Sequence, residues 1–271
     1  MRVLFVLILG ASVWGFSSPA MAGEIPEPGV PILLYHRFGP VVADGMTVTT
    51  ALFESHLKYL REAGYTVIRL KELMAMVLGN GIPAGSRLVV LAADDAHRSV
   101  YTEAFPLLKK YRMPMTVFAY PSAVSNASYA MTWEQLRELQ ASGLCDVQSH
   151  TYWHPNFKKE REKLPPAEFD KLVRLQLSQS KQRLEKELGG KVDLLAWPFG
   201  IFDPWLMDRA AEAGYAAAFS IERRPVTRRD PLMALPRYLL TDRDRGKAFE
   251  LILNGASATT RRDTRHADQH Y

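Results

Sequence analysis

The sequence has very little cysteine, since Cys145 is the single thiol in a chain of 271 residues. An intramolecular disulfide is therefore excluded, and packing in a hydrophobic core must stabilise the fold. The sequence also contains no internal repeat and no long low-complexity segment, which excludes a repeat architecture. Hydrophobic residues make up 47% and charged residues 23% of the chain. This is the balance of a globular protein with a sizeable core.

A nucleic-acid-binding motif is absent as well. The net charge is +5. Many of the basic residues fall in two late clusters, Arg223, Arg224, Arg228 and Arg229, and then Arg261, Arg262 and Arg265. A weakly basic surface favours an anionic partner. Without an accompanying motif, we expect no binding of nucleic acid.

Charge is also missing near the N-terminus, where the apolar stretch 3–16 follows Arg2. The small residues Ala20 and Ala22 then give a cleavage pattern, so residues 1–22 are predicted to be a secretory signal peptide cut after Ala22. The alternative is a retained membrane anchor, but the stretch is short for a span of about 20 residues. We expect a secreted or periplasmic monomer without a stable membrane span.

Apolar runs alternate with amphipathic stretches along the rest of the chain. The predicted strands cover residues 30–35, 65–70, 87–91, 114–120, 147–149, 192–200 and 216–221. The predicted helices cover residues 50–63, 70–79, 99–111, 166–188, 204–213 and 246–253, with one more beginning at Thr132. This alternation predicts parallel βα units that close into a barrel. We expect one α/β domain over residues 23–255 and a disordered polar tail over residues 256–271.

Two adjacent carboxylates, Asp94 and Asp95, follow the apolar strand 87–91. In barrels of parallel strands, reactive groups gather where the strands end. Neighbouring side chains at a strand end point in different directions, so one carboxylate can bind a metal while the other faces substrate or water. The pair equally suits a turn or a helix N-cap.

Two histidines, His150 and His154, follow another predicted strand. At this spacing, two imidazoles can share one face of a helix and bind one cation. With a carboxylate they suit Zn²⁺ and leave a coordination position open for water. The second aspartate would then accept the proton of that water as a general base, which is sufficient to cleave an amide or ester. The alternative is two unrelated surface histidines.

Three short motifs occur in order: Ala92–Ala96 (AADDA), His150–His154 (HTYWH) and Trp197–Gly200 (WPFG). They are similar to the T-F-D-D-G, H-[ST]-x-x-H and Pro-aromatic-Gly motifs of the polysaccharide deacetylases, carbohydrate esterase family 4 with the nodulation-type deacetylase domain. The segments ILLYHRF, FPLLKKYRMPMTVFAYPS and LPRYLL also resemble this family. The resemblance covers about residues 30–242.

The resemblance implies a distorted (β/α)₇ TIM-like barrel and a hydrolase that removes N-acetyl groups from hexosamine units. The substrate would be an N-acetylated polysaccharide or oligosaccharide. Asp94 would be the catalytic base, and Asp95, His150 and His154 would bind a divalent metal, Zn²⁺ in our expectation.

The family's late histidine, its usual general acid, has no counterpart in this chain. Ala196 also stands where the family often has an arginine. His36, after the first strand, and Arg237, in LPRYLL, are the candidates to compensate as catalytic residues.

The aromatic residues of the second and third motifs are candidates to bind substrate. Trp153 and Trp197, with Pro198 and Phe199, would stack on sugar rings. The alternative for each tryptophan is ordinary packing.

Three alanines depart from the first motif, since Ala92, Ala93 and Ala96 replace threonine, phenylalanine and glycine. Two functional alternatives stay open. One is a weakened or inactive deacetylase-fold protein that binds glycan. The other is a peptidase or other amidohydrolase that uses the same three metal ligands.

Overall fold

The computed structural model of the protein describes residues 29–79 and 81–255. The predicted signal peptide and the predicted polar tail lie outside these residues. Within the two described ranges, no helix has the length and hydrophobicity that a membrane span requires.

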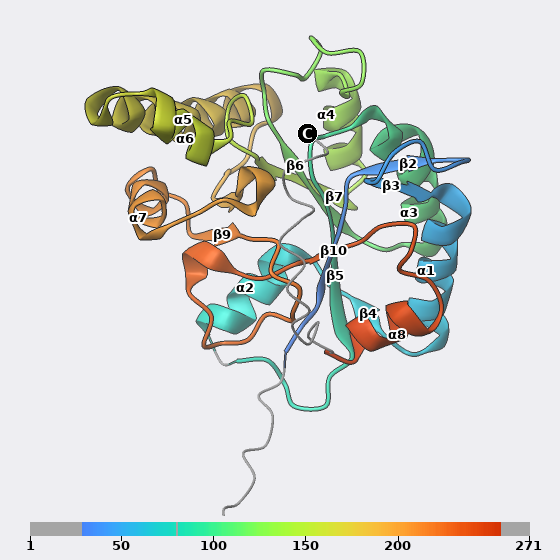
Figure 1. The fold of residues 1–271 in the computed structure, drawn as a ribbon. Helices are drawn as coiled ribbons and strands as arrows, with labels where there is room; N and C mark the ends of the chain where they lie inside the picture. The colour runs from blue at the N-terminus through green and yellow to red at the C-terminus, as the bar shows by residue number, and fades with distance from the viewer. Residues whose placement is uncertain (1–28, 80, 256–271) are drawn as a thin grey trace, which may run out of the picture.

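The main sheet is parallel throughout and strongly curled (Figure 1). Its strands are β1 (Ile32–Tyr35), β4 (Thr66–Val67), β5 (Leu88–Ala93), β6 (Met115–Ala119), β7 (Cys145–Ser149), β8 (Leu194–Ala196), β9 (Ala217–Phe219) and β10 (Tyr238–Leu239). The order is β10-β1-β5-β6-β7-β8-β9, and β4 also pairs with β5. Leu235, just before β10, exchanges backbone hydrogen bonds of 2.8 Å with Ala218 and Ser220, so this segment lies between β9 and β10. The predicted α/β class with parallel strands is confirmed.

Helices cover the sheet, and a two-stranded sheet of β2 (Arg37–Gly39) and β3 (Thr47–Thr49) follows β1. The helices are α1 (Thr50–Glu62), α2 (Leu70–Leu78), α3 (Phe105–Tyr111), α4 (Trp133–Ala141), α5 (Phe157–Lys163), α6 (Pro166–Leu188), α7 (Pro204–Glu212) and α8 (Lys247–Leu253). The single helix predicted over residues 99–111 is instead a π-helical turn, Val100–Ala104, followed by α3. Helix α5 was not predicted.

Side chains of β5 alternate between two hydrophobic clusters, as the pleat of a strand requires. Leu91 and Ala93 belong to the cluster that includes the buried faces of α1, α3, α4 and α6. Val90 and Ala92 belong to the second cluster, inside the curl of the sheet. Asp94 follows β5 on the same side as Val90 and Ala92. Its carboxylate therefore points into the interior of the curled sheet, and the residue is 2% exposed.

His56 lies on α1, where the amphipathic pattern of residues 50–63 predicts a surface position. That prediction is wrong, because His56 is buried at 2% exposure. Its Nδ1 lies 3.1 Å from the Tyr35 hydroxyl and its Nε2 lies 2.7 Å from the carbonyl oxygen of Asp244. Its ring also stacks on Phe249 of α8, with 3.9 Å between ring centres. Helix α8 adds a layer over α1 that the sequence of α1 alone does not reveal.

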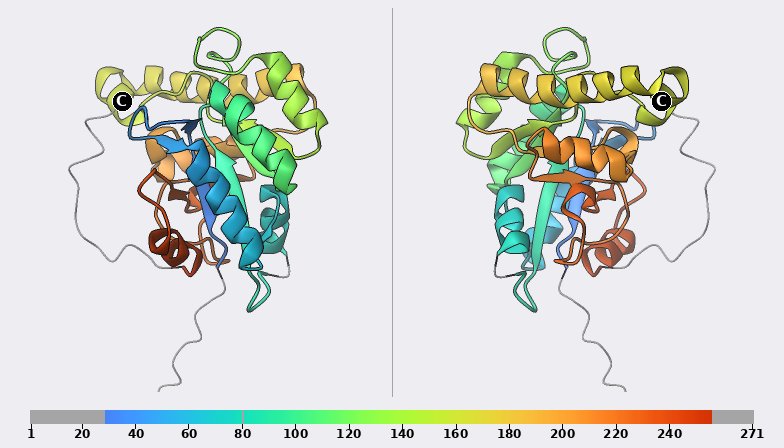
Figure 2. Two further views of the ribbon diagram at one scale, coloured as in Figure 1. Left: turned by 90° about the vertical axis from the view of Figure 1, so that its right-hand side faces the viewer. Right: turned by 90° about the vertical axis from the view of Figure 1, so that its left-hand side faces the viewer.

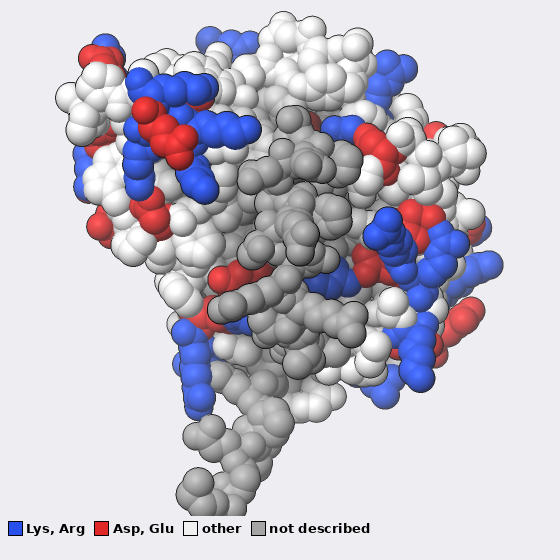
Figure 3. Space-filling view, in the orientation of Figure 1, with Lys and Arg blue, Asp and Glu red and all other residues white. Residues whose placement is uncertain are grey.

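Helix α6 is the longest helix and lies across the upper part of the molecule in both views of Figure 2. It packs against β7 and against α4, α5 and α7. On the face shown in Figure 3, Lys, Arg, Asp and Glu side chains are interleaved at the upper left, over α5 and α6.

Candidate active site

Asp94 is held by a buried arginine at the end of β5. Arg237 donates from Nη1 to Oδ1 at 2.8 Å and from Nη2 to Oδ2 at 2.9 Å. The guanidinium also donates from Nε to the carbonyl oxygen of Ser220 at 3.0 Å and lies 5.3 Å from the centre of the Phe118 ring. All its contacts fix Arg237 in one position, so it holds the Asp94 carboxylate in one orientation.

This ion pair controls the charge of Asp94. Burial alone would raise its pKa, but Arg237 and then His150 favour the carboxylate, and the pKa falls to about 2. Asp94 is therefore an anion at neutral pH.

Asp95 leaves the strand direction through a left-handed turn. Its φ is 69° and that of Ala96 is 48°, in the region that favours glycine. The turn places Asp95 Oδ1 at 3.7 Å from His150 Nε2 and at 3.8 Å from His154 Nε2. Burial raises the pKa of Asp95, while the nearby His150 acts in the opposite direction.

His150 follows β7 directly, and its amide donates to the carbonyl oxygen of Ala119 at 2.8 Å. Its Nδ1 lies 2.8 Å from the carbonyl oxygen of Ala196. A carbonyl only accepts, so we assign the ring proton to Nδ1. The lone pair of Nε2 then faces the two aspartates, which lie 3.7 Å away.

The two histidines of the second motif do not share a helical face, so that prediction is wrong. Residues 150–154 form an irregular loop in which Thr151 and His154 both have a φ of 64°. The Thr151 hydroxyl donates to the carbonyl oxygen of His150 at 2.5 Å and accepts from the amide of His154 at 3.2 Å. The loop brings the two imidazoles together, with 4.5 Å between ring centres.

Gln176 of α6 holds this loop from below. Its Oε1 accepts from the amide of Tyr152 at 3.1 Å and from the amide of Trp153 at 2.9 Å. The side chain is fully buried, and its Nε2 has no hydrogen-bond partner among the described residues. Sequence reasoning missed Gln176, because a lone glutamine within a long amphipathic helix gives no functional signal.

Asp95, His150 and His154 fit a divalent metal. Their ligand atoms all lie within 4.8 Å of one another. Ligands bound at about 2.0–2.1 Å to a tetrahedral ion lie roughly 3.3–3.4 Å apart, which is slightly less than the 3.7 and 3.8 Å from Asp95 to the two imidazoles. Burial and then His150 lower the pKa of His154 to about 2, so its imidazole is in the neutral form that binds a metal.

His36 lines the same cavity and is 7% exposed. Its Nδ1 is buried and has no partner among the described residues. Burial lowers its pKa to about 4, although Asp94 opposes this shift. The imidazole is therefore neutral at neutral pH.

The two aspartates and three histidines surround one cavity of about 20 Å³. A volume of about 10–15 Å³ already accommodates a water molecule. The cavity therefore has room for one ion or one water. The rest of its wall is formed by Trp197, Phe199, Gly200, Ile221 and Leu239.

The aromatic candidates occupy different environments. Trp197 is fully buried, and its indole Nε1 donates to the carbonyl oxygen of Met233 at 2.8 Å. Its ring belongs to the core, as the packing alternative predicted, and Pro198 is buried beside it. Trp153 is 47% exposed. Phe199 has a φ of 56°, and its ring centre lies 4.6 Å from that of His154.

The three alanines of the first motif are fully buried but face different surroundings. Ala92 faces the interior of the curled sheet, whereas Ala93 faces the helices, beside Tyr35 and Val117 on the neighbouring strands. A phenylalanine at position 93 would therefore overpack this cluster, at a cost of about 1–3 kcal/mol. Ala96 takes a left-handed conformation, which costs roughly 1 kcal/mol more for alanine than for glycine.

A curled parallel sheet with Asp and His side chains at the carboxyl ends of its strands defines a class of hydrolase, and similarity to known proteins identifies the family. The sequence profile of the polysaccharide deacetylases matches residues 81–218. The chain belongs to the polysaccharide deacetylase family. The predicted family and the predicted barrel-type fold are thus confirmed.

Two relatives illustrate the similarity in sequence. A putative polysaccharide deacetylase of Bacillus subtilis, YxkH, is 26% identical over 220 residues, which are 81% of this chain and 74% of the relative. A poly-β-1,6-N-acetyl-D-glucosamine N-deacetylase of Staphylococcus aureus is 27% identical over 212 residues, which are 76% of this chain and 71% of the relative.

Two solved structures illustrate the similarity in fold. IcaB from Ammonifex degensii superimposes with a TM-score of 0.69 at 29% identity, covering 80% of this chain and 93% of that one. The deacetylase PplD of Streptococcus pyogenes superimposes with a TM-score of 0.75 at 22% identity, and the match covers 84% of this chain and 99% of that one.

Proposed function

We propose that this protein is a secreted or periplasmic, metal-dependent hydrolase that removes N-acetyl groups from a hexosamine-containing polysaccharide. The observation that carries the proposal is the contact of Asp95 with both His150 and His154, beside an Asp94 carboxylate fixed by Arg237. A divalent ion, Zn²⁺ in our proposal, would be held by Asp95, His150 and His154 and would supply a Lewis acid that polarises an acetamide carbonyl and acidifies water.

The residues of the chain have distinct tasks in this proposal. His150 presents Nε2 to the ion because Ala196 fixes its proton on Nδ1. Asp94 lies 3.7 Å from His150 through its Oδ2 and accepts a proton from the attacking water as general base. Arg237 orients that carboxylate. The proton that Asp94 accepts is the one that the departing amine needs, and His36, in the same cavity, takes it from Asp94 and donates it to that amine.

The substrate class is supported by the relatives and by the surface around the cavity. The named activity of the S. aureus relative is N-deacetylation of poly-β-1,6-N-acetyl-D-glucosamine. Large apolar side chains, Tyr129, Trp153 and Ile221, are between 39% and 47% exposed in the loops after β6, β7 and β9. Such surfaces suit the apolar faces of sugar rings.

The test measures acetate release from poly-N-acetylglucosamine, chitooligosaccharides and peptidoglycan, together with the metal content of the purified mature chain. We expect about one zinc ion per chain, and we expect His150→Ala or His154→Ala to remove it. His97→Ala is the matched control, because His97 lies at the same end of the sheet and its Nδ1 contacts the Ser99 hydroxyl instead. Full occupancy in either ligand variant would rule out this metal site.

The role of Asp94 is tested separately. Asp94→Asn removes the proton acceptor but none of the proposed ligands, so it should keep the metal and lose about 10² to 10⁴-fold in rate. An Asp94→Asn protein that deacetylates at the wild-type rate would show that the two aspartates have been assigned the wrong roles.

A second candidate function is a glycan-binding protein without catalytic activity. It is favoured by one observation, the low pKa that Arg237 imposes on Asp94, because a general base works best with a pKa near the working pH. Saturable binding of an oligosaccharide with no acetate release, in the presence of zinc, would establish this second function.

A further inference from the structure

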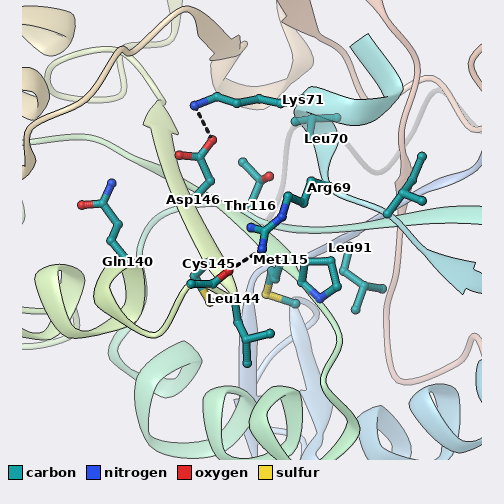
Figure 4. Close-up of a pocket in the computed structure, with 13 residues that line it drawn as sticks. Arg69, Leu70, Lys71, Leu91, Met115, Thr116, Gln140, Leu144, Cys145 and Asp146 are labelled. Carbon is teal, nitrogen blue, oxygen red and sulfur yellow. Dashed lines mark hydrogen bonds and ion pairs between the residues drawn. The ribbon is translucent and has the colours of Figure 1, made fainter. Parts of the chain in front are cut away.

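A second cavity lies at the opposite ends of the strands that carry the candidate site. It has a volume of about 280 Å³ and lies where β6 and β7 begin and where α2 begins (Figure 4). This is close to the lower end of the range for small-molecule sites, about 300–1,000 Å³. Its lining includes Arg69, Leu70, Lys71, Thr116, Cys145 and Asp146.

Arg69 brings a positive charge to the rim of this cavity, where its side chain is exposed. Its guanidinium donates from Nη2 to the carbonyl oxygen of Gly143 at 2.5 Å, as the dashed line in Figure 4 shows. Among the residues that the structure describes, no carboxylate forms an ion pair with Arg69. A guanidinium has five N–H donors, so most of them remain available to a ligand.

Thr116 contributes a buried hydroxyl. Its side chain is 3% exposed, faces the interior of the curled sheet and lies between Asp146 and Arg69 in Figure 4. The hydroxyl lines the cavity, and no hydrogen bond to it is found within residues 29–79 and 81–255. It is therefore free to form a hydrogen bond with a ligand in the cavity.

The first turn of α2 adds two more donors. The amides of Leu70 and Lys71 open this nine-residue helix, and no acceptor for either lies among the described residues. The N-terminus of a helix carries a partial positive charge and attracts anions.

The acceptors in the cavity are largely engaged. The Asp146 carboxylate forms an ion pair of 3.1 Å with Lys71 and accepts from Gln148 Nε2 at 3.0 Å. Arg69 therefore leaves the cavity with an excess of donors and of positive charge. The remaining walls are apolar: Ile68, Leu70, Leu91, Met115 and Leu144.

We propose that this cavity is a binding site for a small organic carboxylate. The guanidinium of Arg69, the Thr116 hydroxyl and the amides that open α2 bind the carboxylate, and the apolar walls contain the body of the ligand. A phosphate ion would satisfy the donors but would leave the apolar walls in contact with water, so an organic anion fits better.

Benzoate is the probe that tests this proposal, with benzamide as its neutral isostere, and the full chain carries its metal throughout. By calorimetry, benzoate should bind with a dissociation constant on the order of 1 mM, a reasonable affinity for so small a ligand. Arg69→Met and Thr116→Val should each weaken binding, the first by roughly tenfold to a hundredfold. Arg87→Met is the matched control, since Arg87 is another exposed arginine that donates to a carbonyl oxygen, that of Ala63.

The single cysteine of the chain locates the ligand. Cys145 lines this cavity and is the only thiol in the sequence. Saturating benzoate should slow the reaction of Cys145 with methyl methanethiosulfonate, and benzamide should not. The proposal is overturned if benzoate does not bind, if benzamide binds equally well, if Arg69→Met leaves the affinity unchanged or if Cys145 reacts at the same rate with benzoate present. Unchanged affinity in Arg69→Met would indicate binding at the metal site and would leave the proposed deacetylase function intact.

Discussion

Arg237 is the residue on which the ionisation of Asp94 depends. The two side chains are separated by 143 positions in the sequence and are both buried, so each compensates the charge of the other. A buried ion pair adds little net stability, but removal of one partner leaves a charge without compensation. The same ion pair therefore both orients the proposed base and is needed for the stability of the barrel interior.

Arg237→Met should lower the free energy of unfolding by about 3–5 kcal/mol, because it leaves Asp94 buried without a counter-ion. The double variant with Asp94→Asn should recover part of that loss. Chemical denaturation of the wild type, the two single variants and the double variant measures the coupling free energy between Arg237 and Asp94. If the losses of the two single variants simply add, Arg237 and Asp94 are energetically independent and the ion pair has no role.

His56 gives the protein a sensitivity to acid. Its pKa is lowered from the ordinary 6.5 to about 4 by burial, although a hydrogen bond to Asp244 opposes this. The unfolded chain therefore takes up a proton more readily than the folded one. Its contribution to stability is complete above pH 6.5, falls as the pH is lowered and is lost below about pH 4.

Each unit of pKa difference between the folded and the unfolded chain corresponds to about 1.4 kcal/mol. Protonation of His56 should therefore lower the free energy of unfolding by roughly 3 kcal/mol between pH 7 and pH 4. His56→Gln cannot take up this proton and should show a flatter dependence. The measurement is the free energy of unfolding against pH for both proteins. Parallel curves would show that His56 titrates normally in the folded protein.

At the scale of elements, Gln176 connects α6 to the loop that carries both histidines. Gln176→Met should lower the free energy of unfolding by about 1–3 kcal/mol, because the amides of Tyr152 and Trp153 lose their acceptor. It should also weaken zinc binding, because the loop is no longer fixed. Gln179→Met is the control, since Gln179 is exposed on the same helix.

Both the affinity for zinc and the stability are needed to interpret this experiment. A Gln176→Met protein that loses stability but binds zinc with the wild-type affinity would show that the glutamine supports the fold and not the loop. Acetate release should follow the zinc affinity of the variant.

The elements that sequence reasoning predicted well have local signals. Helix α6 was predicted with the observed bounds because Pro166 begins it and Gly189 follows its end. The predicted start of a helix at Thr132 is confirmed, and a capping box fixes it, since the backbone amide of Gln135 donates to the Thr132 hydroxyl at 3.2 Å. In both cases a few neighbouring residues determine the boundary.

The loop of the second motif has no such local signal. The left-handed residues Thr151 and His154 are neither glycine nor asparagine, so nothing local predicts their conformation. Their conformation depends on distant contacts, such as those of Gln176. The motif predicted which residues meet, and the structure alone revealed the backbone that brings them together. Likewise, the sequence proposed Arg237 without its partner, because no pattern links positions so far apart.

At the scale of the whole molecule, zinc should stabilise the folded chain, because its proposed ligands come from two strand ends and meet only after folding. Binding to the folded state alone adds about 2.7 kcal/mol when the ligand is at a hundred times its dissociation constant. For a chain of this size, that raises the melting temperature by about 5–10 °C. The measurement is calorimetry with zinc and with a chelator.

The control for this prediction is again His97→Ala, which should keep the zinc-dependent rise. His154→Ala should lose it. An equal rise in the His154 variant would mean that zinc stabilises the protein from another position, and the proposed ligand set would have to be abandoned.

The pairing of β1 with β10 has a consequence for the order of events during synthesis. Leu33 lies opposite Tyr238, so one side of the first strand remains without its neighbour until nearly the whole domain has been made. Contacts between residues so distant in sequence are slow to form. A nascent chain that is still growing at the ribosome therefore cannot complete its sheet until Tyr238 and Leu239 have been added.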